Sequence, residues 1–293
     1  MSDKPVLFVS FSGGRTSGYM CKWLLDNKAN EYDLRFVFAN TGQEHEKTLE
    51  FVDRCDKEFG LDLVWVEGAF NPEKNKGTSF SVVTFDTACR DGRLFEEMIK
   101  VFGVPNTDYP HCNRELKLQP IKSYKAFLGY EREHLMAIGI RADEADRMSF
   151  KALEKGQLTY PLIKWTQTTK AEVRHWWAGQ SFDLEIDEHE GNCKTCWKKS
   201  DRKLFTLAKH NPEWFEVFDT LEQKYSSLKI EGQSVTDRVF FRKHRSARTI
   251  VGDAQLIPFV EFVDHMPELQ LDFLKEIDDL DRESDCGGRC EAF

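Results

Sequence analysis

The chain has 293 residues, of which 40% are hydrophobic and 31% charged, so it can bury a core and wholesale disorder is excluded. The net charge of −9 argues against a general nucleic-acid binder. No apolar run approaches about 18 residues, so no membrane span is expected. The N-terminus has no signal-peptide shape, which predicts a cytoplasmic protein whose eight cysteines are reduced and serve a metal site, catalysis or both.

The first informative stretch is a predicted strand at 6–9, a Ser-Gly-Gly turn and a helical pattern from Met20 onward. A helix that begins directly after such a turn presents unpaired backbone N–H groups and the positive end of its dipole, which together form an anion site. The alternative is a purely structural glycine turn. The residues that would hold a phosphate are Ser10, Ser12, Gly13, Gly14, Arg15, Thr16 and Ser17.

Residues 12–17, Ser-Gly-Gly-Arg-Thr-Ser, resemble the pyrophosphate loop (PP-loop) of the adenine-nucleotide alpha hydrolase superfamily. The resemblance implies that the chain binds an adenine nucleotide, either ATP or an adenylyl sulfate. Thr16 stands where the family usually has Asp, so the resemblance leaves open how an accompanying Mg²⁺ would be held.

Further strands at 34–38 and 61–66, with a helix between them, predict an α/β fold with a doubly wound parallel sheet. Ligands of such sheets bind beyond the carboxyl ends of the strands, which makes Asn40, Thr41, Gly42 and Glu44 candidates for the ribose or base. The stretch 40–49 is similar to a segment of phosphoadenylyl-sulfate (PAPS) reductases. Residues 71–90 lack a clear period and are predicted to be a long loop before a helix at 94–102.

The second informative stretch, 109–120, combines Cys112 with Arg114 and Lys117, which are three positions apart and are expected to share a helix face. Such cations can hold a sulfate or phosphate and would lower the pKa of the thiol. The stretch resembles the Cys-Cys segment of assimilatory adenylyl-sulfate reductases, whose cysteines ligate a [4Fe–4S] cluster. His111 replaces the first cysteine, so either His111 is a ligand or another thiolate takes its place.

A fourth strand at 134–138 is followed by Gly139 and Arg141, which resemble the Gly-x-Arg segment of the same reductases and would bring a third cation to the crevice. Cys193 and Cys196 form a Cys-x-x-Cys motif that could hold a metal or a cluster or act as a redox dithiol, with zinc as the main competing metal. By the resemblance, these two cysteines and Cys112 are cluster ligands.

The pattern from 201 to 227 is helical, and a basic run at 238–248 is interpreted as a solvated face in preference to a phosphate-binding track. Near the end, Asp285-Cys286-Gly287 resembles the reductase segment that bears the nucleophilic cysteine. The resemblance therefore assigns catalysis to Cys286, with Lys117 and Arg141. Cys290 has no counterpart in that segment and is the candidate to replace the thiolate lost at His111; the roles of the two terminal cysteines could be exchanged.

Together these features predict a nucleotide-binding α/β domain at 1–190 and a helical C-terminal region at 191–293. The predicted function is reduction of an adenylyl sulfate to sulfite at a cysteine and [4Fe–4S] site, with a thiol reductant. The alternative is an ATP-dependent sulfurtransferase that adenylates and thiolates a nucleic acid or a small molecule, and a third, less favoured interpretation is a non-enzymatic regulator. A homo-oligomer is expected, and no membrane partner.

Overall fold

The computed structural model describes residues 4–73, 77–191, 193–230 and 237–263. Its centre is a sheet with the strand order β4-β3-β2-β1-β5-β6, in which every neighbouring pair is parallel except β3 and β4. This arrangement confirms the predicted α/β class. The strands are β1 (Val6–Phe11), β2 (Asp33–Ala39), β3 (Val64–Phe70), β4 (Thr78–Val83), β5 (Met136–Ala137) and β6 (Leu158–Thr159).

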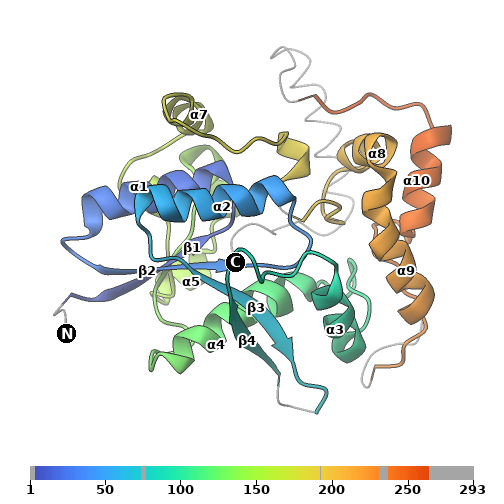
Figure 1. Cartoon of the computed structure of the whole chain (residues 1–293), viewed down its shortest axis with the longest axis horizontal. Helices are drawn as coiled ribbons and strands as arrows, with labels where there is room; N and C mark the ends of the chain where they lie inside the picture. Colours follow the sequence, from blue (N-terminus) through green and yellow to red (C-terminus); the bar gives the residue numbers. More distant parts are fainter. Residues whose placement is uncertain (1–3, 74–76, 192, 231–236, 264–293) are drawn as a thin grey trace.

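The central strands β1 and β2 are apolar on both faces because helices cover both sides of the sheet. Helices α1 (Arg15–Lys28) and α2 (Glu46–Phe59) lie on one face, and α4 (Gln119–Phe127) lies on the other (Figure 1). The buried cysteines of α1 and α2, Cys21 and Cys55, belong to the core between these helices and the sheet.

The third strand begins at Val64, later than the predicted position 61. Helix α2 ends at Gly60 in the left-handed conformation, and Asp62 also has a positive φ of 54°. Residues 60–63 therefore form a helix-to-strand turn, and Leu61 and Leu63 pack into the core from this turn. Because these turn residues are apolar and buried, the sequence pattern assigned them to the strand.

The prediction of a continuous loop at 71–90 was wrong, because β4 lies within it and pairs antiparallel with β3 from Trp65↔Val83 to Phe70↔Thr78. This strand is at the edge of the sheet, and most of its residues are at least partly exposed. An edge strand needs only a weak apolar alternation, which is easily missed among serines and threonines.

Helices α8 (Asp201–His210), α9 (Glu216–Tyr225) and α10 (Ala247–Leu256) form the C-terminal part and pack against α3 (Arg93–Phe102) in one apolar cluster (Figure 1). No helix in the described residues is long and apolar enough to cross a membrane. The remaining helices are α5 (Phe150–Glu154), α6 (Pro161–Lys164), α7 (Lys170–Ala178), the π-helix η1 (Arg114–Leu118) and the 3₁₀ segments η2 (Ala142–Arg147), η3 (Glu188–Glu190) and η4 (Pro212–Phe215).

Candidate nucleotide and thiol site

The glycine loop connects β1 to the N-terminus of α1. Gly13 has φ +85°, and a Cβ there would lie 2.8 Å from Cγ2 of Thr48, so both the backbone and the packing require glycine. The Ser17 hydroxyl is 3.0 Å from the Gly14 carbonyl, to which it donates, and accepts from the Ser12 N–H at 3.2 Å. Among the described residues no side chain caps α1, so its first N–H groups are available for an anion.

Arg141 joins the end of β5 to this loop. Its Nη1 donates to the Thr16 hydroxyl at 2.8 Å, and its guanidinium also pairs with Asp143 and Glu144, each at 3.1 Å. Gly139, just after β5, allows the backbone there to lie close to helix α1, because a Cβ at this position would be 3.2 Å from Cα of Ser17. The structure thus brings the Arg141 guanidinium into contact with Thr16, the loop residue that differs from the resembled pattern.

Two other predicted loop residues have different surroundings. The Arg15 side chain pairs with Asp183 at 2.7 Å and donates to the Leu184 carbonyl, so it fastens a later segment to the start of α1. Ser10 is half-buried within β1, opposite Val37 of β2. The hydrogen bonds of the Arg15 guanidinium are internal to the chain.

Asn40 and Thr41 follow β2, as predicted, but their roles differ. Asn40 is completely buried and donates to Oε1 of Glu67 at 2.6 Å and to the Cys89 carbonyl at 2.9 Å, so its amide hydrogens are used within the chain. The Thr41 N–H and hydroxyl both donate to the buried carboxylate of Glu44, at 3.0 and 2.8 Å. Glu44 was predicted as a further candidate for the ribose or base, and its carboxylate is instead occupied by these hydrogen bonds from Thr41.

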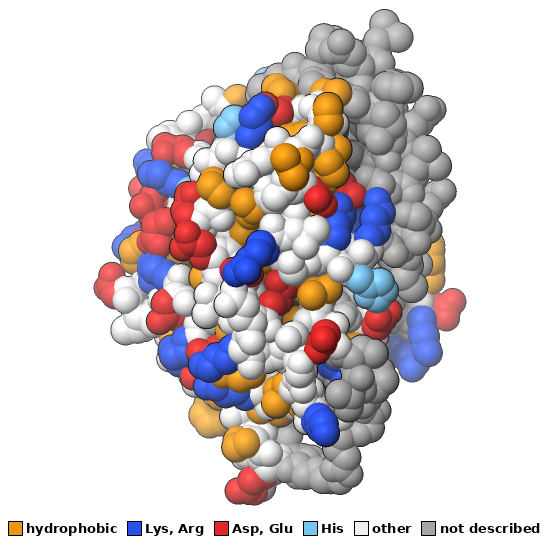
Figure 2. All heavy atoms as spheres, turned by 90° about the vertical axis from the view of Figure 1, so that its right-hand side faces the viewer, with side chains coloured by type: hydrophobic (Ala, Val, Ile, Leu, Met, Phe, Trp, Pro, Cys, Tyr) orange, Lys and Arg blue, Asp and Glu red, His pale blue; other side chains and the backbone are white. Residues whose placement is uncertain are grey.

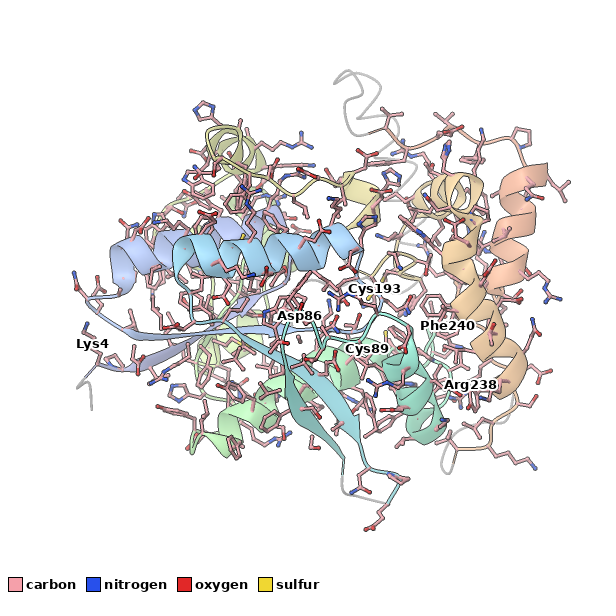
Figure 3. The ribbon with its side chains drawn as sticks, in the orientation of Figure 1. Lys4, Asp86, Cys89, Cys193, Arg238 and Phe240 are labelled. Carbon is pink, nitrogen blue, oxygen red and sulfur yellow. The ribbon has the colours of Figure 1, made fainter. Side chains whose placement is uncertain are left out.

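The Cys-x-x-Cys segment docks on the end of β2, between the sheet and the C-terminal helices (Figure 3). The Sγ of Cys193 lies 3.3 Å from the Thr41 hydroxyl, and residue 193 forms a β-bridge with Glu44. The Lys194 N–H donates to the Gln43 carbonyl at 2.8 Å. These contacts place a thiol of the C-terminal region at the sheet edge that also carries the glycine loop.

Lys117 and Arg114 diverge because they lie on the π-helix η1, whose wider turn does not keep residues three apart on one face. Lys117 Nζ lies 3.9 Å from the buried Glu44 carboxylate. The half-exposed Arg114 instead pairs with Glu115 at 2.5 Å. The structure therefore places Lys117 beside Cys193 and Thr41, and it leaves Arg114 paired with its neighbour.

The prediction that nearby cations lower the pKa of Cys112 was wrong. Burial raises the pKa of this thiol to about 12, and the neighbouring Cys196 and Cys193 add to the rise. Burial also raises the pKa of Cys193 to about 12, with a further contribution from Glu44 that Lys117 opposes. Both groups are therefore neutral thiols at pH 7, and the three cysteines are electrostatic neighbours.

The described donor set does not fit the [4Fe–4S] cluster that the resemblance implies. In residues 4–263, outside the gaps named above, no three His, Cys, Asp or Glu side chains are placed to hold one metal ion. The Nε2 of His111 lies 3.0 Å from the Gly103 carbonyl, and burial lowers the pKa of this imidazole to about 4. Cys286 and Cys290 lie outside the described residues.

The interpretation of the basic run at 238–248 as a solvated face was wrong for Arg238 and Arg242, which are buried, whereas Lys243, His244 and Arg248 are exposed. The Arg238 guanidinium stacks 4.0 Å from the centre of the Tyr109 ring, and Arg242 and Arg245 both pair with Asp201. On the face that Figure 2 shows, Lys and Arg are interspersed with Asp and Glu and do not form a continuous track.

Residues 6–176 match the model of the phosphoadenosine phosphosulfate reductase domain. The chain is 34% identical over 215 residues to the uncharacterized nin region protein ORF290 of Escherichia phage lambda, which covers 72% of each protein. Two uncharacterized proteins of Methanocaldococcus jannaschii are also similar. MJ0066 is 30% identical over 59% of this chain and 29% of its own length, and MJ0973 is 34% identical over 39% of this chain and 21% of its own length.

Proposed function

Because the chain belongs to the phosphoadenosine phosphosulfate reductase domain family, we propose that it is an enzyme that binds an adenylyl sulfate and reduces it to sulfite. The nucleotide phosphate would bind at the glycine loop and the N-terminus of α1, with Arg141 as its side-chain partner. The sulfate would extend toward Lys117 and the thiols at the end of β2.

One observation carries this proposal: the Cys-x-x-Cys segment is hydrogen-bonded to the end of β2, at the same sheet edge as the glycine loop. The carboxyl ends of parallel strands face one crevice. An anion bound at the loop after β1 therefore lies at the same edge of the sheet as the thiols at the end of β2. A sulfur nucleophile beside an adenylate site is what sulfonucleotide reduction requires.

The resemblance assigns the attack on sulfur to Cys286, and the crevice itself contains the further pair Cys193 and Cys196. A [4Fe–4S] cluster would need ligands beyond those that the described residues provide, so no step of this proposal depends on one.

The test is a turnover panel with the full-length protein purified anaerobically. The substrates are adenosine 5′-phosphosulfate and its 3′-phosphorylated form, each with dithiothreitol, and sulfite and the released nucleotide are measured. We expect equimolar sulfite and nucleotide from one of the two substrates. Absence of sulfite from both, at protein concentrations that bind the nucleotide, would contradict the proposal.

ATP-dependent sulfur transfer is the second candidate, favoured by the complete Ser-Gly-Gly-x-x-Ser loop, in which the Ser12 and Ser17 hydroxyls lie 2.9 Å apart. Its signature is release of pyrophosphate from ATP, and the same panel measures it. The internal pairing of Arg242 and Arg245 favours a small-molecule acceptor over a nucleic acid for this activity.

A further inference from the structure

Strand β4 forms one end of the sheet and pairs with a neighbour on one side. That neighbour is β3, and the antiparallel pairing runs without interruption from Trp65↔Val83 to Phe70↔Thr78. Within the part of the chain that the structure describes, no strand pairs with the second side of β4. This side therefore presents the free N–H and C=O groups of an edge strand, next to helix α4 (Figure 1).

The strand lacks the features that usually keep such an edge from pairing with another chain, which are charged residues, proline and bulges. Residues 77–85, Gly-Thr-Ser-Phe-Ser-Val-Val-Thr-Phe, contain no charged residue and no proline. The pairing with β3 has no bulge, and Ser79, Ser81 and Val82 are exposed. Two copies of this strand can pair without bringing like charges opposite each other.

An apolar surface continues from the strand onto helix α4. The Phe80 ring packs against the rings of Tyr124 and Phe127, with ring centres 5.4 and 5.6 Å apart. Val82 is two residues from Phe80 and therefore lies on the same face of the sheet. Val82 is 60% exposed and Phe127 is 75% exposed. Large apolar side chains in water beside an open strand edge are typical of an interaction surface.

We propose that this edge is a dimer interface, in which the β4 strands of two copies pair antiparallel about a two-fold axis at Ser81. Residues opposite each other in an antiparallel pair lie on the same face of the sheet. With the axis at Ser81, Phe80 of each copy lies opposite the partner's Val82, and pairs of an aromatic with a β-branched residue stabilise sheets. An axis at Phe80 would instead use Thr78, whose hydroxyl donates to the buried Glu115 carboxylate.

The size of this surface predicts a dimer that dissociates on dilution. A strand of six residues is about 20 Å long and a sheet about 10 Å thick, so the strand edge presents about 200 Å². A typical stable interface buries about 800 Å² per partner, so Phe127 and Leu128 at the end of α4 must contribute to the interface. The glycine loop follows β1, which β2 and β3 separate from β4, so the dimer leaves that loop uncovered.

The first experiment is sedimentation velocity of the full-length protein between about 1 and 100 µM. We expect the mass of the wild type to rise with concentration toward twice that of one chain. V82K places a charge opposite the partner's Phe80 and should raise the dissociation constant at least about tenfold. Because Val82 is exposed, V82K should keep the circular dichroism spectrum of the wild type. V260K is the matched control, at a valine that is 56% exposed outside the sheet, and should dimerise as the wild type does.

The second experiment tests the position of the two-fold axis. S81C is oxidised at a concentration at which the wild type is dimeric, and its peptides are analysed by mass spectrometry. We expect a disulfide between position 81 of the two copies. In S79C the two new thiols would be four residues out of register, or about 14 Å apart, which is too far for a disulfide.

Each outcome decides for or against the proposal. A wild type that stays monomeric at about 100 µM overturns it, and would leave the open edge to a strand of a different protein. A dimer that V82K does not weaken also overturns it, because the copies then meet elsewhere. A disulfide in S79C in place of S81C overturns the axis at Ser81.

Discussion

At the scale of single residues, Arg141 is the side chain that connects the glycine loop with the opposite wall of the crevice. Its guanidinium donates a hydrogen bond to Thr16 and also pairs with the carboxylates of Asp143 and Glu144. A phosphate at the loop would compete for this cation with charge-assisted hydrogen bonds.

Replacing Arg141 with Ala removes that partner, so we expect the dissociation constant for adenosine 5′-phosphosulfate or ATP to rise about tenfold to a hundredfold. Isothermal titration calorimetry measures it. R174A, which removes an exposed pair with Glu188, is the control and should bind as the wild type does. Unchanged affinity in R141A would exclude Arg141 from the nucleotide site.

Glu222 gives a second prediction at this scale. The buried carboxyl accepts the N–H groups of Phe240 and Ala247 at 2.7 and 2.8 Å, and burial raises its pKa from 4.5 to about 7 despite these bonds. Folding therefore favours the protonated form. The resulting stabilisation is complete below about pH 4.5 and is lost as the pH rises through about 7.

This group alone should lower the free energy of unfolding by up to about 3 kcal/mol across that interval. The measurement is urea unfolding at several pH values. E222Q should be less stable at low pH but should lose this pH dependence, whereas E213Q on the exposed surface should retain it. The assignment would be contradicted if the free energy of unfolding of the wild type rose between pH 4.5 and 7 and that of E222Q changed with the same slope.

At the scale of elements, the turn between β1 and α1 depends on two glycines for different reasons. Gly13 has a positive φ and contacts Thr48, whereas Gly14 has an extended φ of −99° and no atom within 4 Å of the position of a Cβ. The first glycine is needed for folding, and the second leaves space beside the helix N-terminus.

We therefore expect G13A to lower the free energy of unfolding by about 1–3 kcal/mol. G14A should change it by less than about 0.5 kcal/mol, yet weaken nucleotide binding because its methyl group occupies the approach to the N–H groups. Denaturant unfolding and calorimetry separate the two effects. Equal stability of the two variants would show that the turn tolerates a side chain at 13.

At the scale of the whole molecule, one apolar cluster joins the C-terminal helices to helices that precede residue 190. The apolar cluster of the C-terminal helices includes residues of α3 and η1, such as Phe95 and Leu116. Phe218 of α9 makes edge-to-face contacts with Phe95 and with Phe240, at 5.4 and 4.5 Å between ring centres. The C-terminal helices therefore complete the packing of helices that precede them by about a hundred residues.

Such a shared core predicts that F218A destabilises the whole chain, by about 3–5 kcal/mol, and that unfolding remains one transition. Circular dichroism and tryptophan fluorescence should give coincident midpoints. F150A, at a phenylalanine that is 61% exposed, is the control and should change stability little. Two separate transitions would show that the regions fold independently.

The sequence alone indicated the first alternating strands and helices, the glycine loop and the edge of the sheet at which ligands bind, because these depend on local periodicity and on the topology of parallel sheets. Only the tertiary structure decided the contacts made at that edge. The burial that raises the pKa of Cys112, the π-helical turn that separates Arg114 from Lys117, and the internal bonds of Asn40 all depend on residues distant in sequence. Spacing along the chain specifies which side chains share an element, but desolvation and pairing are set by the neighbours that folding brings in.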